Sequence, residues 1–337
     1  MPNRRISLFC AIVLTLVSCS NKTEPSRTEF VIGTVCSVTL YDQAKPAVYR
    51  DIFARLREIE SRMSVNLPDT DVVRINAAAG VAPVQVHDDV FEVIERAVHY
   101  AEISGGAFDP TVEPLVRLWG IGGDNPRVPS QAEIDAVLPM INWRDIELDR
   151  QQRSVFLKRP GMALDLGAIA KGYAADEAAA IIRKARLKRA IIDLGGNILT
   201  FGKKKDKSLW RVGLQDPVEI RGAYLGFVTG PESSVVTSGV YERFFDFEGK
   251  RYHHIFSTVN GYPTSNGLLA VTIITKYSIN ADALSTAVFV LGYEKGRALI
   301  ESLEETEAIF VFDDKSVRKT EGVDLRITNE NYTFVPD

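Results

Sequence analysis

Three oxygen-bearing side chains are spaced along one expected helix in a way that suits a hard metal ion. In Ala281-Asp-Ala-Leu-Ser-Thr-Ala287, the residues Asp282, Ser285 and Thr286 occupy positions i, i+3 and i+4, which share one face of a helix. A carboxylate and two hydroxyls are ligands that Mg²⁺ or Ca²⁺ accepts. The alternative is structural: the Asp282 carboxylate favours the positive end of the helix, and the hydroxyls bond back to earlier carbonyls.

A second segment that could carry chemistry is Leu164–Asp176. The short apolar stretch Gly161–Leu166 predicts a buried strand. Gly167 interrupts it, and an Ala-rich helix is expected over Ala168–Lys184. A strand that turns sharply into a helix leaves first-turn N–H groups free to bind an anion, and Asp165 lies beside this turn. The alternative, which the pattern alone favours, is a tight strand–helix crossover packed by small residues.

Two shorter segments carry further candidate groups. Val236–Tyr241 indicates a strand that ends in a hydroxyl-rich turn at Gly239. Backbone N–H groups and hydroxyls in such a turn can bind phosphate, and an ordinary polar turn is the commoner explanation. His253 and His254 would point to opposite faces of a strand. One of these imidazoles can face a cleft as an acid or base, whereas satisfied packing explains most single histidines.

Composition excludes several classes of function. The chain has 337 residues, of which 45% are hydrophobic and 25% charged, as in an ordinary globular protein with a sizeable core. The net charge of −4 gives no reason to expect nucleic-acid binding. The sequence has only four histidines and no G-x-x-x-x-G-K-[ST], G-x-G-x-x-G, H-E-x-x-H or C-x-x-C motif. A dedicated zinc site or a Rossmann dinucleotide site is therefore not expected.

The N-terminus is expected to be a secretory signal rather than part of the fold. Two arginines precede the apolar run Ile6–Val17, which ends in the lipobox Leu16-Val-Ser-Cys19, and this order is typical of a bacterial lipoprotein signal. A membrane anchor is the alternative, but the run is shorter than the roughly 20 residues that a spanning helix needs. The expected units are a signal peptide over residues 1–18, a tether over 19–29 lipidated at Cys19, and one domain over 30–337.

The elements that must position the candidate groups alternate irregularly between strands and helices. Period-two alternation predicts one strand over Phe30–Tyr41, and an apolar helical face predicts a helix over Ala47–Met63. Further elements are helices over Val90–Ser104, Asn280–Leu291 and Glu294–Leu303, strands over Arg189–Leu194, Trp210–Leu214, Ala223–Val228, Ser234–Ser238 and Leu269–Thr275, and a hairpin of Arg243–Phe247 with Arg251–Phe256. Meandering strands with scattered helices predict an α+β fold with mixed and antiparallel sheets.

Six short segments, in the order in which they occur, resemble the FAD:protein FMN transferases of the ApbE family. They are Gly106-Ala-Phe-Asp-Pro-Thr111, Asp165-Leu-Gly-Ala-Ile-Ala-Lys-Gly-Tyr-Ala-Ala-Asp176, Asp193-Leu-Gly-Gly-Asn197, Thr237-Ser-Gly-Val-Tyr241, His254-Ile-Phe256 and Ala281-Asp-Ala-Leu-Ser-Thr286. The likeness covers nearly the whole mature chain from Ile32 onward. It implies a two-lobed single unit.

The resemblance implies an enzyme that uses Mg²⁺ to cleave the diphosphate of FAD. Such an enzyme passes the FMN moiety to a threonine hydroxyl of a flavoprotein and releases AMP. Members of the family are typically exported and often lipidated, which agrees with Cys19. The implied partners are FAD, an acceptor subunit of a membrane redox complex and, through the lipid anchor, the membrane. The implied location is the periplasmic face of the inner membrane.

The resemblance also assigns roles to individual residues. The metal would be held by the Asp282 carboxylate, the Thr286 hydroxyl and the backbone carbonyl of Ala168. Ser285 stands where many members have a second acidic ligand, so the charge for a full second metal site is missing. Asp282 and His254 would be catalytic, with His254 as the acid or base. The FAD contacts would be Ile32, Ala107, Phe108, Asp109, Asp165, Lys171 and Ile255, with Ser238, Gly239 and Tyr241 lining the same cleft.

Two positions depart from the family pattern. Asn66 stands at the FAD site where many transferring members carry a Tyr, and an aromatic ring there would cover the flavin. Asn66 cannot do so, which leaves the site open to water and makes hydrolysis of FAD to FMN and AMP an alternative. Ser257-Thr258 replaces a frequent Asp-Pro pair. Two non-enzymatic alternatives are a flavin-binding periplasmic lipoprotein and a purely structural one.

Overall fold

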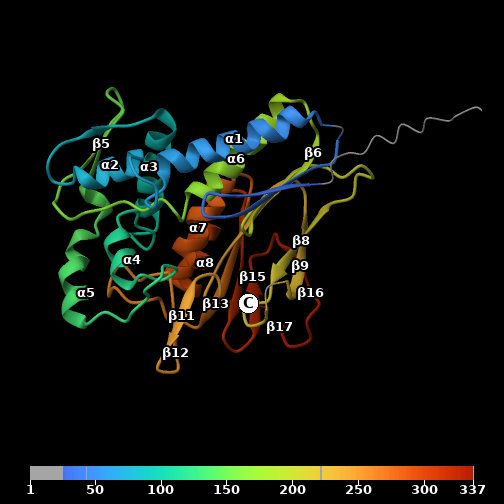
Figure 1. The fold of residues 1–337 in the computed structure, drawn as a ribbon. Coiled ribbons are helices and arrows are strands. Elements are labelled where there is room, and N and C mark those ends of the chain that lie inside the picture. Colours follow the sequence, from blue (N-terminus) through green and yellow to red (C-terminus); the bar gives the residue numbers. More distant parts are fainter. Residues whose placement is uncertain (1–25, 43, 221, 337) are drawn as a thin grey trace, which may run out of the picture.

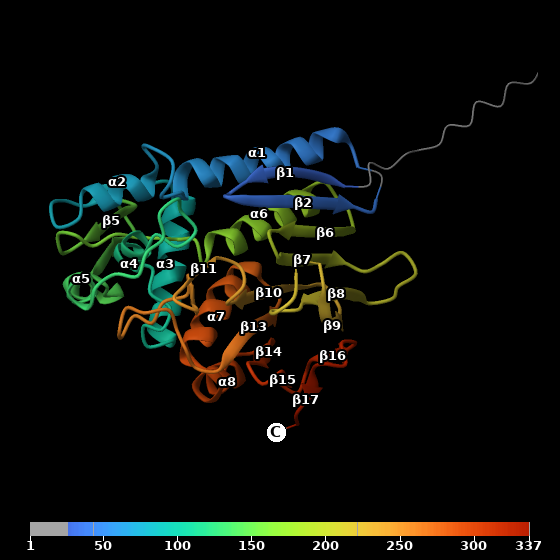
Figure 2. The ribbon, with the colours of Figure 1, turned by 60° about the horizontal axis from the view of Figure 1, so that its bottom comes forward.

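A nine-stranded sheet forms the centre of the molecule. In sheet order, its strands are β1 (Arg27–Val31), β2 (Thr34–Leu40), β6 (Arg189–Leu194), β7 (Asn197–Gly202), β10 (Ser233–Gly239), β13 (Leu268–Thr275), β14 (Thr306–Phe312), β15 (Ser316–Lys319) and β17 (Thr333–Phe334). Neighbouring strands are antiparallel, except that β15 and β17 are parallel. Figure 2 shows these strands following one another across the molecule, with β1 and β17 at opposite edges.

The structure is a computed structural model that describes residues 26–42, 44–220 and 222–336. The expected signal peptide, Cys19 and most of the tether lie outside the described residues. No helix in these ranges is both long enough and apolar enough to cross a membrane.

Smaller sheets flank the central one. A three-stranded sheet has the order β16 (Asp324–Ile327), β9 (Tyr224–Gly230) and β8 (Trp210–Gln215), and another has the order β3 (Val84–Gln85), β5 (Ser154–Leu157) and β4 (Ile146–Asp149). The strands β11 (Phe244–Phe247) and β12 (Lys250–His253) form a hairpin, as the turn signal Glu248-Gly249 predicts.

The helices bury apolar faces against these sheets. They are α1 (Pro46–Met63), α2 (Asp71–Ala77), α3 (Asp88–Ile103), α4 (Glu113–Trp119), α5 (Gln131–Val137), α6 (Ala170–Lys184), α7 (Ser278–Leu291) and α8 (Tyr293–Glu301), with 3₁₀ turns at Leu138–Met140 and Trp143–Asp145. In α1, for example, Ile52, Leu56 and Ile59 are completely buried, at the three- and four-residue spacing of one helix face.

The two faces of the central sheet are covered differently. The main core joins one face to α1, α3, α6, α7 and α8. A second core, with Val212, Leu225 and Ile309 among its members, joins the other face to the sheet of β8, β9 and β16, and Figure 1 shows this sheet on the side away from α6 and α7. A third cluster surrounds Trp119 on α4. Helices packed on a mostly antiparallel sheet confirm the predicted α+β class.

Two of the predicted elements are wrong in detail. The strand predicted over Phe30–Tyr41 is a hairpin, because Ile32 and Gly33 form a turn between β1 and β2. Ile-Gly lacks the Asn-Gly signal that usually marks such a turn. The segment Gly161–Leu166 belongs to no sheet and makes only an isolated bridge at Ala163. A short buried apolar run can be extended without being a strand, and periodicity cannot tell the two apart.

Candidate active site

Several chain turns meet at one end of the central sheet. They are the β1–β2 turn at Ile32–Gly33, the β6–β7 turn at Gly195–Gly196 and the end of β10 at Ser238–Gly239. The antiparallel pairing of β2 with β6 and of β7 with β10 places all three at the same end. Gly195 lies directly beside Thr34, because a Cβ on this glycine would come within 2.2 Å of Thr34 Oγ1.

The helices α6 and α7 cross closely beside this end of the sheet. A Cβ on Gly172 would lie 2.3 Å from the Ser278 carbonyl oxygen and 2.7 Å from Ile279 Cα. Only glycine fits at this crossing, because real Cβ atoms do not approach other heavy atoms below about 3 Å and interiors are close-packed. Gly172 thus lets α7 approach α6 closely and brings the two candidate helices together. The strand–helix crossover that the pattern favours is not what this contact shows, because the segment before α6 is not a strand.

A pair of carboxylates holds the crossing from both sides. Asp282 on α7 accepts the Gly172 N–H in the first turn of α6, at 2.9 Å. Asp176 on α6 accepts the Ser278 and Ile279 N–H groups at the start of α7, each at 2.9 Å. Each helix therefore provides the N-terminal cap of the other. Burial raises the pKa of Asp176 to about 6, and the two backbone hydrogen bonds oppose this rise.

Lys171 brings a positive charge to the buried Asp282 carboxylate. Its Nζ lies 3.3 Å from Asp282 Oδ1 and donates to the Gly167 carbonyl oxygen at 2.9 Å. Asp282 is only 3% exposed, so a paired cation is what this carboxylate requires. The ammonium shows that oxygen donors from α7 and from the turn before α6 converge on a position that suits a cation.

Hydroxyl groups extend the polar site along α7. Ser285 Oγ donates to the Asp282 carbonyl oxygen at 2.9 Å, which is the back-bonding expected on the structural interpretation. Ser238 Oγ on β10 lies 2.8 Å from Ser285 Oγ and 3.4 Å from Thr286 Oγ1. Ser285 is completely buried, whereas Thr286 is half-buried. The predicted metal residues on α7 and the end of β10 are therefore one cluster.

The donor chemistry of this cluster fits a hard divalent cation. In a regular helix the Gly172 N–H would pair with the Ala168 carbonyl, but it is donated to Asp282 instead. Within the described ranges, no backbone N–H outside the regular elements pairs with the Ala168 carbonyl. One carboxylate, one hydroxyl and one carbonyl are the oxygen ligands that Mg²⁺ prefers. The described residues contain no group of three or more His, Cys, Asp or Glu side chains suited to a metal.

The carboxylates of the predicted contacts Asp165 and Asp109 both accept hydrogen bonds from their own loops. Asp165 Oδ1 accepts the Gly167 N–H at 2.7 Å. The Asp109 carboxylate accepts the N–H and Oγ1–H of Thr111 at 2.8 and 2.6 Å, and the Trp143 N–H at 3.1 Å. Burial raises the pKa of Asp109, although these hydrogen bonds oppose the rise. Asp109 therefore shapes its own loop, while Asp165 shapes the turn that precedes α6.

The two adjacent histidines have different surroundings. His253 is buried, and its Nε2 lies 2.9 Å from the Thr264 carbonyl oxygen while its Nδ1 accepts the Ile255 N–H at 3.2 Å. His254 is half-buried, and its Nδ1 lies 3.2 Å from the Arg243 carbonyl oxygen. Burial is the main cause that lowers the pKa of His254 to about 4, and the hydrogen bond to the Arg243 carbonyl opposes this shift.

The remaining predicted residues differ in how they meet this cluster. Ile32 is half-buried at the β1–β2 turn, Ala107 is half-buried, and Phe108 and Ile255 belong to the main core. The hydroxyl of Thr258 donates to the Gly106 carbonyl oxygen at 2.8 Å, so the segment after His254 lies against the segment that contains Ala107. Asn66 is exposed in the turn between α1 and α2, and Tyr241 packs against the second core.

A family model described as the ApbE family matches residues 32–310, which is most of the chain. The chain belongs to the ApbE family. The match begins at Ile32 and contains every predicted metal-binding and FAD-binding residue. The six segments that carry the resemblance also lie within it.

Individual relatives align with this chain over most of their length. A Treponema pallidum protein named FAD:protein FMN transferase is 38% identical over an alignment of 351 residues, covering 98% of this chain and 97% of the relative. A Klebsiella pneumoniae protein of the same name is 39% identical over 287 residues, covering 85% and 89%. The crystal structure of the ApbE protein from Thermotoga maritima superposes with a TM-score of 0.81 at 31% identity, covering 88% and 96%. The flavin transferase ApbE from Vibrio cholerae gives a TM-score of 0.77 at 25% identity, covering 91% and 97%.

Two residues that position this ApbE-family site, Asp176 and Glu60, were not assigned a role from the sequence. Asp176 lies in a motif that the sequence analysis singled out, but its partners at the start of α7 are about a hundred residues away. Glu60 on α1 accepts the Gly33 N–H at 3.2 Å. The only signal for Asp176 was its place at the end of the Leu164–Asp176 motif, and Glu60 had none.

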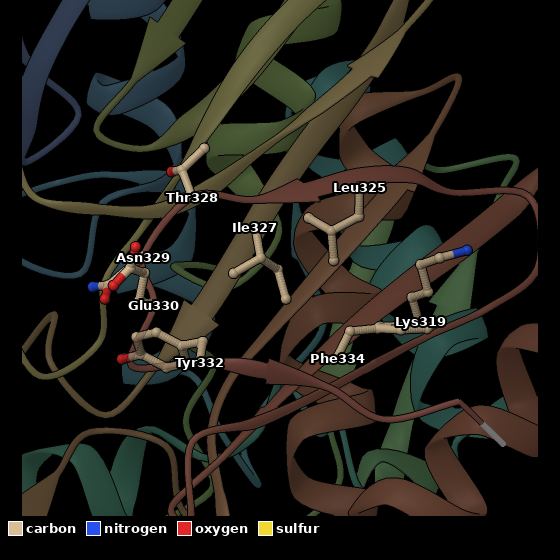
Figure 3. Close-up of a pocket in the computed structure, with 8 residues that line it drawn as sticks. All are labelled: Lys319, Leu325, Ile327, Thr328, Asn329, Glu330, Tyr332 and Phe334. Atoms are coloured by element: carbon tan, nitrogen blue, oxygen red, sulfur yellow. The ribbon is translucent and has the colours of Figure 1, made fainter.

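A separate hollow lies outside the segment that matches the ApbE family. It has a volume of about 390 Å³ and is lined by Lys319, Leu325, Ile327, Thr328, Asn329, Glu330, Tyr332 and Phe334. Figure 3 shows side chains of β16 facing those of the chain end that contains β17. The lining includes none of the predicted site residues, so the candidate active site is the cluster at the sheet end rather than this hollow.

Proposed function

We propose that this chain uses Mg²⁺ to transfer the FMN moiety of FAD to a threonine hydroxyl of a target flavoprotein, with release of AMP. The observation that carries the proposal is the convergence of the Asp282 carboxylate, the Lys171 ammonium and the Gly167 carbonyl at the α6–α7 crossing. Membership of the ApbE family and the names of the relatives support the choice of FAD and of a protein acceptor.

The charges of the site suit a bound diphosphate. Lys171 provides an ammonium, and the start of α6 provides the positive end of a helix dipole. The Ala170 and Gly172 N–H groups of this first turn are already paired, with the Leu166 carbonyl and with Asp282. Asp282, Thr286 and the Ala168 carbonyl would hold Mg²⁺, which when bound neutralises charge on the diphosphate as the phosphorus–oxygen bond breaks. The buried position of Asp282 keeps water from weakening these interactions.

His254 is suited to take the proton from the attacking hydroxyl. Its low pKa keeps the ring neutral at physiological pH. With the Nδ1 proton donated to the Arg243 carbonyl, Nε2 keeps a lone pair. As the acceptor oxygen bonds to the phosphorus of the FMN moiety, Nε2 accepts the hydroxyl proton and the bond to the AMP oxygen breaks. AMP leaves with the electron pair of that bond.

Hydrolysis of FAD to FMN and AMP is a second candidate function, and Asn66 favours it. The residue is exposed and carries no ring, so it cannot cover a flavin as an aromatic side chain would. Water could then replace the acceptor hydroxyl while the metal-binding residues act in the same way. Asn66→Tyr would therefore raise the ratio of transfer to hydrolysis.

One experiment separates these functions. The purified protein is incubated with FAD, Mg²⁺ and an acceptor fragment, and in-gel flavin fluorescence and nucleotide chromatography are measured together. Fluorescence fixed to the acceptor with equimolar AMP supports transfer, whereas free FMN and AMP support hydrolysis. EDTA or Asp282→Ala should abolish both. FAD that remains unchanged after long incubation would contradict both reactions and indicate a flavin-binding protein without chemistry.

We also propose that the protein is a lipoprotein held at the periplasmic face of the inner membrane, where it meets an acceptor subunit of a membrane redox complex. The support is the lipobox ending at Cys19. Membrane fractionation of cells that express the full chain tests this: the unaltered protein should sediment with inner membranes, and Cys19→Ser should not. Equal distribution of the two proteins would contradict the anchor.

A further inference from the structure

Ile32 has a backbone conformation that its side chain disfavours. Its φ is +49° and that of Gly33 is +69°, so both central residues of the β1–β2 turn are left-handed. Two-residue turns of this kind favour Asn-Gly, because a β-branched residue at positive φ clashes with its own backbone. Every other non-glycine residue with positive φ in the described ranges is polar or charged. Ile32 is therefore an outlier that turn chemistry does not explain.

The turn is held in place from two sides. On one side, Oε1 of Glu60, near the end of α1, accepts the Gly33 N–H at 3.2 Å. On the other, the Thr34 side chain fills the space beside Gly195. Strained residues persist where the surrounding structure fixes them, and they occur most often at functional sites. These contacts fix the turn at the sheet end where the candidate active site lies.

We propose that Glu60 is a positioning residue that clamps the Ile32–Gly33 turn so that Ile32 is presented to FAD. Asparagine would suit the turn better, so the isoleucine is retained for its apolar side chain rather than for the turn. The proposal rests on the proposed function, because it requires FAD to bind beside Ile32. Glu60 itself acts through the turn and touches no reacting atom.

The test is a double-mutant cycle on FAD affinity, measured by flavin fluorescence titration in EDTA. Glu60→Ala should weaken FAD binding about five- to tenfold, the effect of losing a hydrogen bond to a charged group, while kcat at saturating FAD with Mg²⁺ changes less than about twofold. Glu60→Gln should restore most of the affinity, because its amide oxygen accepts the same N–H. In an Ile32→Asn background, Glu60→Ala should have no further effect, since the turn no longer needs the clamp.

Strain gives a second, independent readout. Ile32→Asn should raise the thermal midpoint of unfolding and yet weaken FAD binding. The β11–β12 turn offers a matched control, because Glu248 also has a φ of +49° and is followed by Gly249 at +75°. Glu248→Asn should raise the midpoint by less, because glutamate is not β-branched, and leave FAD affinity unchanged. Glu58→Ala, on the same helix as Glu60, removes the carboxylate that pairs with Arg55 at 2.7 Å. It should lower the midpoint without changing FAD affinity.

Three outcomes would overturn the proposal. An equal loss of affinity from Glu60→Ala in both backgrounds would show that Glu60 does not act through the turn. FAD affinity unchanged by Ile32→Asn would show that Ile32 is not retained for the ligand. In both cases the proposed function would stand, because the unaltered chain would still bind and cleave FAD. If the unaltered chain bound no FAD at all, the proposed function would fail and this proposal with it.

Discussion

The different partners of His253 and His254 decide which of these adjacent residues is available for chemistry. Both ring nitrogens of His253 are engaged within the fold, by the Thr264 carbonyl and the Ile255 N–H. His254 is engaged through Nδ1 alone among the hydrogen bonds described for its ring. Desolvation lowers the pKa of both imidazoles, so both rings are neutral near pH 7, and only His254 keeps an available acceptor nitrogen.

A pH profile tests the role of His254. The residue accepts a proton only when neutral, and its pKa in the free protein is about 4. We therefore expect kcat/KM for FAD cleavage to rise with pH through a midpoint near 4 and to stay level between about pH 5.5 and 8. His254→Gln should lower the rate on the plateau by roughly 100-fold, within the range of general-base contributions.

His99→Gln is the matched control, because His99 is exposed on α3. Its rate and profile should equal those of the unaltered protein. If kcat/KM instead rose through a midpoint near 6.5 in both the unaltered protein and His254→Gln, the titration would belong to another group.

At the scale of elements, the α6–α7 crossing fixes the positions of the site residues. The titration of Asp176, which lies at this crossing, makes the stability of the protein depend on pH. The pKa of Asp176 is about 6 in the folded state, mainly through burial, against an ordinary value of 3.8. The folded state thus holds the proton more tightly, so the free energy of unfolding should fall as pH rises from about 4 to about 6. The shift corresponds to about 3 kcal/mol.

Urea unfolding of the unaltered protein and Asp176→Asn, measured from pH 4 to 8, isolates this contribution. The asparagine does not titrate, so the difference between the two curves should change by up to about 3 kcal/mol between pH 4 and 6 and be constant above. Asp51→Asn removes an exposed carboxylate from α1 and should follow the unaltered protein. If the difference in unfolding free energy between the unaltered protein and Asp176→Asn did not vary with pH, the raised pKa of Asp176 would be contradicted.

Gly172→Ala tests the close approach of the same two helices. The added Cβ would lie 2.3 Å from the Ser278 carbonyl oxygen, so the helices must separate, at a cost of about 1–3 kcal/mol. The same separation moves Asp282 away from α6, and AMP release should fall with it. Ala180→Ser, at an exposed position of α6, should change neither property. A Gly172→Ala variant with normal stability and rate would show that the crossing is looser than described.

The sequence predicted the elements well where local pattern decides them, and poorly where contacts between elements decide them. The period of three to four apolar residues predicted α1 to within one residue, and the spacing on α7 predicted one shared face for Asp282 and Thr286. The β1–β2 turn was missed because isoleucine disfavours the positive φ that this turn requires, so Ile-Gly does not signal a turn. The roles of Asp176 and Glu60 were missed because their partners, on α7 and in the β1–β2 turn, are brought near only by folding.

At the scale of the whole molecule, the antiparallel central sheet is what gathers distant segments into one site. Alternate connections return to the same end, so turns at Ile32, Gly195 and Ser238 meet there although they span more than two hundred residues. The covering helices α6 and α7 begin or cross at that end and add Lys171 and Asp282. A ligand bound there would lie beside elements from distant parts of the chain, so its binding should stabilise the fold as a whole.

Such a ligand effect should be cooperative, because Lys171 now occupies the position next to Asp282. Its Nζ lies 3.3 Å from Asp282 Oδ1, so Mg²⁺ that bound alone, as the proposed function requires, would compete with this ammonium. The diphosphate of FAD would attract the same ammonium and leave Asp282 accessible to the metal. Mg²⁺ and FAD should therefore each raise the affinity for the other by one common factor.

Thermal unfolding measures this coupling. We expect the midpoint to rise slightly with Mg²⁺ alone and more with FAD in EDTA. With both ligands, the rise should exceed the sum of the two separate rises. A single ligand at a hundredfold excess over its Kd stabilises the folded state by about 2.7 kcal/mol. AMP is assayed after each scan to correct for turnover. Lys171→Met should reduce the excess over the sum, because the competing charge is gone while the attraction between Mg²⁺ and the diphosphate remains. Asp282→Asn should lose the Mg²⁺ response while keeping that to FAD. Additive shifts in the unaltered protein would contradict the competition between Lys171 and the metal.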